Sequence, residues 1–268
     1  MKVAVIGHIE WATFATVDHL PTAGEIIHAK DSWQEPAGGG SVAAMQLAEL
    51  ADQCLFFTSV GDDEIGREAV RQLEKHGLTV YAAIDKTRPT RRVIVHIDAS
   101  HERTITVLGE ALKPSGNDTS LPWHELASAD AVYFTQGDTA AVNAGRQAPV
   151  LVSTARVLPV LRESSIELDA LVYSQNDPSE RYNDSDLNPL PKLTVATNGT
   201  HGGTTNTGLQ YSAELSPPDK FIDSYGCGDS FAAGLTFGLG NGLNVEEALK
   251  VAANCGAQAA QRRGAFQI

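Results

Sequence analysis

The sequence predicts an α/β fold with a central, mainly parallel sheet flanked by helices and a small β-sheet lid. Short apolar runs recur along the chain, and segments with helical patterning separate them. The runs are rich in β-branched or aromatic residues and lack polar alternation, as expected of parallel strands covered on both faces. The predicted buried strands are residues 3–6, 55–60, 131–135, 150–153, 170–173 and 193–197.

Four helices are predicted between and after these strands. They cover residues 41–51, 65–76, 229–239 and 245–261. Gly77 directly follows the second helix, in the position where glycine usually ends a helix. Strands that alternate with helices are typical of a layered α/β fold.

Two stretches interrupt this alternation and are assigned to the lid. Residues 11–35 carry a turn at residues 21–24 between extended segments. Residues 91–108 contain two strands in which apolar and polar residues alternate around a polar turn. Strands of this kind belong to a sheet with one face in water, unlike the buried strands above. Residues 175–191 are rich in Asn, Asp, Pro and Ser and are expected to form a loop.

Composition excludes several classes of partner. The chain has 268 residues, 42% of them hydrophobic, which is typical of a globular protein. Its formal net charge is -13, so nucleic acids and anionic membranes are not expected as partners. Three cysteines, an odd number spaced far apart, indicate reduced thiols. The short apolar run at the N-terminus does not resemble a signal peptide, and we therefore expect a cytoplasmic protein.

The most informative segment is DSYGCGD at residues 223–229, which runs into a predicted helix. Gly226 and Gly228 allow a tight turn that points successive N–H groups at one spot, and the helix adds its unpaired N–H groups and partial positive charge there. Asp229 lies at the edge of this turn. Its carboxylate can take a proton from a hydroxyl while the amides stabilise a transferring phosphoryl group. The alternative is that Asp229 only caps the helix.

Two other segments offer backbone to a ligand. The glycine run at residues 36–40 leads into the first helix and is either a second contact surface or a hinge between lid and core. Residues 197–199, Thr-Asn-Gly, close a predicted strand. Loops at the carboxyl ends of strands are where open α/β sheets bind ligands.

Taken in order, these segments resemble the ribokinase-like (PfkB-type) carbohydrate kinases over essentially the whole chain. The matching motifs are Gly7 after the first strand, LPTAGE at 20–25, Gly38-Gly39, VGDDEIG at 60–66, ERT at 102–104, DSYGCGD at 223–229, and Asn254 followed by RGA at 263–265. The resemblance implies one ribokinase-like kinase domain over residues 1–268, with lid segments near 11–35 and 91–108. It also implies ATP-dependent phosphorylation of a hydroxyl on a sugar or sugar-like small molecule.

The resemblance also implies roles for individual residues. Asp229 is the catalytic base, and the amides of Gly226, Cys227 and Gly228 form the anion hole. Thr197 and Gly199 lie along the phosphates of ATP, and Asn254 lies near the adenine.

ATP and Mg²⁺ are the implied cofactors, and a monovalent cation is a further candidate. Family members carry an Asn-x-x-Glu stretch that organises Mg²⁺ and phosphate. The corresponding loop here is SQNDPSE at 174–180, which makes Asn176 and Glu180 the candidate metal residues with one extra residue between them.

The acceptor side departs from the family pattern. Gly38 and Gly39 match the glycine pair at the substrate, but Glu10 and Ala12 stand where the family has Asn and Asp for sugar hydroxyls. The Asn that usually follows the glycine pair has no counterpart in SVAA at 41–44. Glu10 is either a replacement ligand or a solvated lid charge. We therefore predict poor activity on free ribose or fructose.

Four further residues have alternative interpretations. Gln136 and Asp138, after another strand, either face the substrate or form a plain loop. His8 either touches the substrate or is a hydrogen-bonded structural histidine. Cys227 occupies an alanine position of the family motif, which favours a small filler over a nucleophile.

Two competing functions stay open. One is a nucleotide- or metabolite-binding regulator without turnover, which the missing sugar ligands favour and the retained Asp229 disfavours. The other is a kinase for a nucleoside or a vitamin-like alcohol. A lid sheet with one apolar face and no helix of its own also predicts a homodimer formed through the lids.

Overall fold

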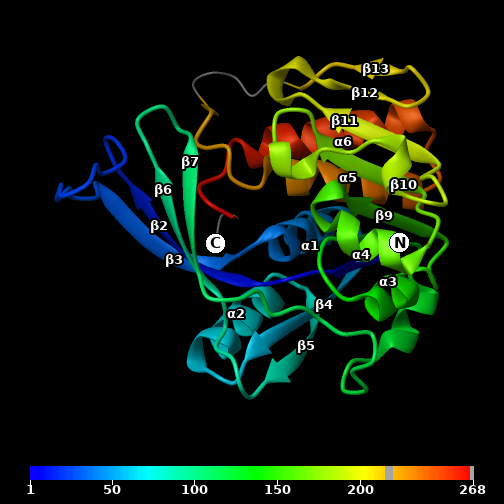
Figure 1. The fold of residues 1–268 in the computed structure, drawn as a ribbon, viewed down its shortest axis with the longest axis horizontal. Helices are drawn as coiled ribbons and strands as arrows, with labels where there is room; N and C mark the ends of the chain where they lie inside the picture. The colour runs from blue at the N-terminus through cyan, green and yellow to red at the C-terminus, as the bar shows by residue number, and fades with distance from the viewer. Residues whose placement is uncertain (215–219, 266–268) are drawn as a thin grey trace.

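The computed structural model describes residues 1–214 and 220–265, and its core is a nine-stranded sheet (Figure 1). The strand order is β13-β12-β11-β10-β9-β8-β1-β4-β5, and neighbouring strands are parallel except where β12 pairs with β11 and with β13. The strands are β1 Lys2–Ile6, β4 Gln53–Gly61, β5 Thr79–Asp85, β8 Ala131–Phe134, β9 Val150–Thr154, β10 Ala170–Ser174, β11 Leu193–Thr197, β12 Gly203–Thr205 and β13 Gln210–Tyr211. All six predicted strands are confirmed, whereas β5, β12 and β13 were not predicted.

Helices cover both faces of this sheet. They are α1 Gly39–Leu50, α2 Glu64–Lys75, α3 Thr139–Gly145, α4 Leu158–Ser164, α5 Cys227–Gly240 and α6 Val245–Ala259. The 3-10 helices are Trp123–Ser128, Ala155–Val157, Pro178–Glu180, Asp184–Asp186 and Gly199–His201. In β1, Val3 and Val5 pack in the apolar cluster with α1, α5 and α6, and Ala4 and Ile6 pack with α3 and α4. Strand side chains alternate between faces, so one short apolar strand serves two layers.

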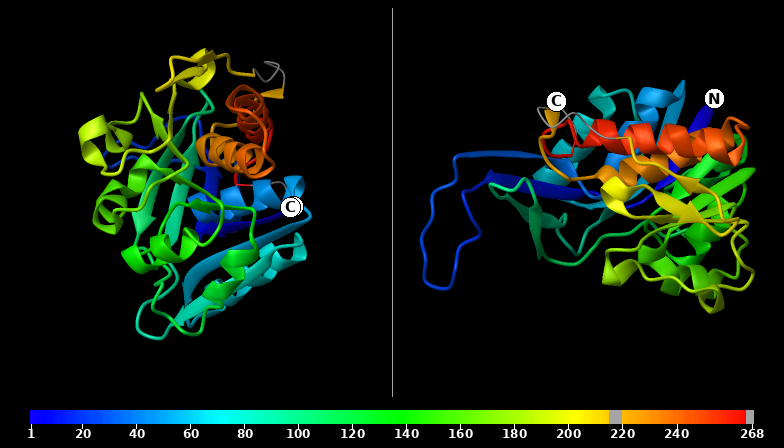
Figure 2. Two further views of the ribbon diagram at one scale, coloured as in Figure 1. Left: turned by 90° about the vertical axis from the view of Figure 1, so that its right-hand side faces the viewer. Right: turned by 90° about the horizontal axis from the view of Figure 1, so that it is seen from above.

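The lid is a separate four-stranded sheet of order β3-β2-β6-β7, which confirms the predicted lid. Its strands are β2 Glu10–Thr16, β3 Asp31–Ala37, β6 Arg92–Ile97 and β7 Arg103–Leu108. Figures 1 and 2 show it projecting from one side of the layered core. Only β2 and β6 run parallel within it. Alternate residues of β6 are buried while β7 is exposed along its length, so the lid has one wet face.

The topology brings the predicted site residues to one edge of the sheet. The carboxyl ends of parallel strands lie at the same edge, where open α/β sheets bind ligands. β1 leads there into the lid, and β3 returns from the lid directly into α1. Within residues 1–214 and 220–265, no helix combines the length and apolar character required to span a bilayer.

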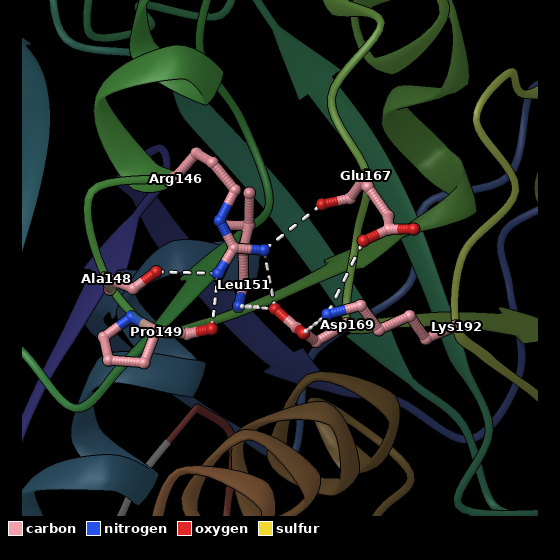
Figure 3. A network of polar contacts seen from close by, with 7 residues as sticks. All are labelled: Arg146, Ala148, Pro149, Leu151, Glu167, Asp169 and Lys192. Carbon is pink, nitrogen blue, oxygen red and sulfur yellow. Dashed lines mark hydrogen bonds and ion pairs between the residues drawn. The ribbon is translucent and has the colours of Figure 1, made fainter.

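At the opposite end of the strands, where their amino ends lie, a polar network centred on Asp169 holds the sheet together (Figure 3). One carboxylate oxygen of Asp169 accepts hydrogen bonds from Arg146 at 2.6 Å and from the Leu151 N–H at 2.8 Å, and the other accepts one from Lys192 at 2.8 Å. The guanidinium of Arg146 also donates to the carbonyl oxygens of Ala148 and Pro149. These contacts tie together the starts of β9, β10 and β11, far along the strands from the candidate site.

Candidate active site

The glycine turn and the start of α5 form an open cluster of backbone amides. Gly226 is the N-cap of α5, with a left-handed φ of 76°. A Cβ at this position would lie 2.8 Å from Cγ1 of Val42, so both conformation and space require glycine. The N–H groups of Cys227, Gly228 and Asp229 belong to the first helical turn and have no intrahelical partner. No atom lies within 4 Å of the place a Cβ would take at Gly228, so this side of the turn is open.

Buried hydrogen bonds hold this turn against the lid and α1. Asp223 is fully buried, and its carboxylate accepts from the Tyr225 N–H at 2.8 Å and from the Gly264 N–H at 2.9 Å. The hydroxyl of Tyr225 accepts from the Gly38 N–H at 3.1 Å. The turn before α5 and the glycine segment before α1 are therefore fixed relative to each other.

Asp229 lies where α1 and α5 begin. A Cβ at Gly39 would lie 2.7 Å from Oδ1 of Asp229 and 3.3 Å from Oγ1 of Thr135. The carboxylate therefore sits directly on the backbone of Gly39. Asp229 is the third residue of α5, and the N-cap is Gly226 without a side-chain cap. The interpretation of Asp229 as a capping residue is wrong, because the backbone of the glycine turn starts the helix.

The structure brings Arg156 to the site, a residue that sequence reasoning missed. Arg156 follows β9, and its Nε donates to Oε1 of Glu180 in an ion pair. Oε2 of Glu180 accepts from the Ser174 N–H at 3.0 Å. Burial works against the charge of Arg156, but the carboxylates of Asp229 and Glu180 outweigh it and raise the pKa of the guanidinium. The available signal was its position just after a predicted strand, at the edge where ligands bind.

The two candidate metal residues are already engaged by protein groups. Both oxygens of Glu180 accept hydrogen bonds, and Nδ2 of Asn176 donates to Oδ1 of Asn198 at 3.2 Å. In the described part of the chain, no three His, Cys, Asp or Glu side chains gather in a way that would hold a metal. Because Arg156 places its positive charge beside Glu180, direct ligation of Mg²⁺ by this carboxylate does not fit the structure.

The residues expected along ATP lie at the end of β11 and on α6, with Thr197 half-buried and Gly199 and Asn254 exposed. Thr197 ends β11, and its hydroxyl donates to the Tyr173 carbonyl at 3.3 Å. Gly199 follows with φ 53° and is exposed, and a Cβ there would come only within 4.0 Å of Nδ2 of Asn176. Asn254 is exposed on α6, two residues before Gly256, where a Cβ would lie 3.4 Å from the Cys227 carbonyl oxygen.

On the acceptor side, Glu10 is buried beside the glycine pair. Its residue exposure is 7%, so it is not a solvated lid charge. Its Oε1 lies 3.1 Å from Nε of Arg91 and 3.7 Å from Nε2 of His8. Gly38, with φ 91°, has its backbone against both, since a Cβ there would lie 2.9 Å from Cδ2 of His8 and 3.1 Å from Cγ of Glu10. Burial, with Arg91 nearby, lowers the pKa of His8 to about 4, so the imidazole is neutral.

The structure gives Asp138 a capping role and leaves the thiol of Cys227 unactivated. Asp138 caps α3, since its carboxylate accepts from the Ala141 N–H at 2.8 Å and from the Gly116 N–H at 2.9 Å. Burial raises the pKa of Cys227 to about 11, so its thiol stays protonated at neutral pH and is not an activated nucleophile.

Comparisons with known proteins show what the chain is similar to over most of its length. The chain is 29% identical to the ATP-dependent ribose-1-phosphate kinase of Halopiger xanaduensis, over 99% of this chain and 94% of the relative. It is 21% identical to the ribokinase of Bacillus subtilis, over 94% and 90% of the two chains. The crystal structure of ribokinase from Thermotoga maritima has the same fold, with a TM-score of 0.79 at 19% identity, covering 98% of this chain and 94% of that one.

The sequence profile of the pfkB family carbohydrate kinases matches residues 1–165 and 166–267, which is nearly the whole chain. The profile thus includes the lid, the glycine pair and the glycine turn before α5. The chain therefore belongs to the pfkB family of carbohydrate kinases.

Proposed function

We propose that this ATP-dependent carbohydrate kinase phosphorylates a hydroxyl of a sugar or sugar-like small molecule, with Asp229 as general base and the amides of Gly226, Cys227 and Gly228 as the anion hole. The observation that carries the proposal is the position of the Asp229 carboxylate. It lies against the backbone of Gly39 and beside the open amides at the start of α5.

This arrangement supplies the elements that phosphoryl transfer requires. Asp229 accepts the proton of the acceptor hydroxyl, which strengthens the oxygen as a nucleophile. The amides of the glycine turn and the partial positive charge of α5 stabilise the negative charge that develops during transfer. Arg156, held by Glu180, adds a full positive charge on the same side. Positioning and charge stabilisation are the main contributions a protein makes to this reaction.

Bound MgATP supplies the phosphoryl group that is transferred. The residues present fit a nucleotide, because Gly199 and Asn254 are exposed, Thr197 is half-buried at the end of β11, and Gly228 faces open space. Thr197 and Gly199 are proposed to contact the phosphates, and Asn254 is proposed to lie near the adenine. Asn176 and Glu180 act on the metal through water or through their partners, since Arg156 and Ser174 occupy the carboxylate of Glu180.

Relatives support a sugar as the acceptor without deciding its form. The Halopiger xanaduensis relative is a ribose-1-phosphate kinase, and the Bacillus subtilis relative is a ribokinase. The regulator without turnover is disfavoured, because a binding protein has no need for a carboxylate placed against Gly39 at the mouth of the anion hole.

The test is Asp229→Asn, assayed for ADP release and titrated with ATP by calorimetry. Loss of a general base lowers the rate about two to four orders of magnitude. ATP affinity should stay within a few-fold, because the proposed phosphate contacts are backbone amides. Glu246→Gln is the control, since it also removes a carboxylate from the first turn of a helix but at an exposed pair with Lys250. An Asp229→Asn variant with the parent's kcat would refute the assignment of the base.

A further inference from the structure

The inner face of the lid carries a fixed arginine next to the acceptor site. Glu10 begins β2, and Arg91 directly precedes β6. The Trp11 N–H donates to the Arg91 carbonyl at 2.9 Å, and the register pairs Trp11 with Arg92, so Glu10 and Arg91 are neighbours across the two strands. The residues that continue this face, Ala12 and Val93, are buried and apolar. The charged pair therefore lies at the base of an otherwise apolar stretch of these two strands.

The backbone that carries Arg91 is also held firmly. Thr90 is buried, and its N–H and hydroxyl donate to the carboxylate of Asp63 at 2.7 and 2.8 Å. Asp63 is in turn the N-cap of α2, where it accepts from the Gly66 N–H at 2.7 Å. Arg91 is thus fixed on one side by the cap of α2 and on the other by β2. With the backbone fixed and Nε paired with Glu10, the side chain has less conformational freedom to lose when it binds a ligand.

The terminal amino groups of Arg91 are free to bind an anion. Nε faces Glu10 at 3.1 Å in an ion pair without an aligned hydrogen bond, and the side chain is 19% exposed. No residue of the described ranges accepts a hydrogen bond from its Nη1 or Nη2. These two groups form a planar fork that matches the oxygens of a phosphate or carboxylate. Arg156 also contacts a carboxylate, that of Glu180, through Nε, there with a hydrogen bond.

The position of Arg91 connects it to the acceptor rather than to the nucleotide. Gly39 lies against Asp229, and the next residue towards the lid, Gly38, lies against Glu10 and His8. The charges of Asp229 and Arg91 both act on Glu10 and on His8, so the Asp229 carboxylate and the Glu10–Arg91 pair lie near each other along the glycine pair. His8 is neutral and adds no charge there. An acceptor with its reacting hydroxyl at Asp229 would extend its other end towards Arg91.

We propose that the acceptor is a sugar that already carries a phosphate ester, and that Arg91 binds this phosphate. The inference rests on the proposed function, because it assumes that Asp229 marks the position of the reacting hydroxyl. A neutral sugar would leave the fork of Arg91 without an acceptor in a partly buried place, which is unfavourable. A neutral sugar would also not find the Asn and Asp side chains that bind sugar hydroxyls in the family, because Glu10 and Ala12 stand at those positions. The product is then a sugar bisphosphate, so a reaction that releases a phosphorylated sugar must supply the substrate.

The experiment compares free and phosphorylated sugars by ADP release, using ribose, ribose 1-phosphate, ribose 5-phosphate, fructose and fructose 6-phosphate. We expect kcat/KM for at least one sugar phosphate to exceed that for its parent sugar by about 100-fold or more. Arg91→Gln should lower this value about 100-fold, mainly through KM, as expected for a lost charged contact. Its KM for ATP should stay within about three-fold, because the proposed ATP contacts involve other residues. Arg92→Gln, which removes the same charge from the opposite, exposed face of β6, should change none of these values.

Loss of Arg91 leaves Glu10 buried without its partner, so the double variant Glu10→Gln/Arg91→Gln is measured as well. It removes both charges and should fold as the parent does while still discriminating poorly between free and phosphorylated sugars. Calorimetry of ribose 1-phosphate and ribose 5-phosphate with Asp229→Asn, with and without Arg91→Gln, adds a measurement that needs no turnover. Equal or higher kcat/KM on the free sugars would overturn the inference and leave the kinase intact. Sugar-phosphate binding that depends on Arg91, without turnover by the parent on any acceptor, would support the inference and overturn the proposed function. Absence of both would overturn both.

Discussion

Adding one methyl group at Gly39 should misplace the carboxylate of Asp229, the proposed general base, while leaving the fold intact. A Cβ there would lie 2.7 Å from Oδ1 of Asp229, and the ordinary contact distance begins at 3.4 Å. The oxygen must therefore move by about 0.7 Å, and a displacement of about 1 Å at a catalytic group can lower the rate about 100-fold. We expect Gly39→Ala to lower kcat by about 10- to 100-fold. Because the residue begins α1 with φ outside the left-handed region, alanine is tolerated there and should change the free energy of unfolding by about 1 kcal/mol or less.

The assay is steady-state ADP release with the single variants and with Gly39→Ala/Asp229→Asn. If the methyl group acts through Asp229, it should add little to the loss in Asp229→Asn, so the two effects should not be additive. Urea denaturation of each variant separates a misplaced carboxylate from a destabilised fold. Full additivity in the double variant, or a kcat of Gly39→Ala equal to that of the parent, would refute the role of this contact.

Three further predictions concern stability and assembly. Asp169→Asn should lower the free energy of unfolding by about 1–3 kcal/mol without changing kcat. Burial raises the pKa of the Asp169 carboxyl, but the hydrogen bonds from Lys192, Leu151 and Arg146 outweigh burial, and the pKa is lowered overall. The stabilisation by Asp169 is therefore full above about pH 4 and is lost as the pH falls further, which urea titrations at several pH values will show. Burial raises the pKa of Glu35 to about 7, so stability should fall as the pH rises from about 4.5 to 7, and Glu35→Gln should flatten that slope in thermal unfolding. We also predict a homodimer through the lids, because a groove of about 570 Å³ beside the lid has apolar side chains including Trp11 and Leu108. Leu108→Glu should then be a monomer by light scattering, and a parent that is a monomer at high micromolar concentration would contradict the prediction.

Buried strands and long helices were predictable because each has a strong local pattern. β1, β8 and β11 are apolar on both faces, and α2 ends at the predicted glycine. The elements that were missed have weaker patterns. α3 and α4 have only seven residues each, which is too short for helical periodicity to stand out. β5 lies at the edge of the sheet, so its side chains are mostly half-buried and the continuous apolar signal is absent.

The candidate site was only partly predictable, for a related reason. The glycine turn and Asp229 are contiguous in sequence, so their motif could be read directly. The partners of the charged groups are not contiguous. Glu10 meets Arg91 through strand pairing in the lid, and Arg156 meets Glu180 across two strand ends. Nothing local in the sequence shows that these acids are buried or paired, and Glu10 therefore looked equally compatible with a solvated charge.

If Asp229 is the general base, as proposed, the charges around it explain why these pairs accompany it. A carboxylate that takes a proton from the acceptor must work beside a phosphoryl group that is itself negative, and the two repel. The open amides at the start of α5 offset part of this repulsion, and Arg156 offsets more with a full charge. Arg156 can offset this repulsion only if its guanidinium stays in place. The ion pair with the buried carboxylate of Glu180 holds it there. If Arg91 binds the phosphate of the acceptor, this arginine holds one end of the acceptor while Arg156 offsets the charge of the transferring phosphoryl group at the other end. The reacting hydroxyl is then fixed between the two arginines. Fixing the nucleophile in this way supplies the positioning on which phosphoryl transfer depends.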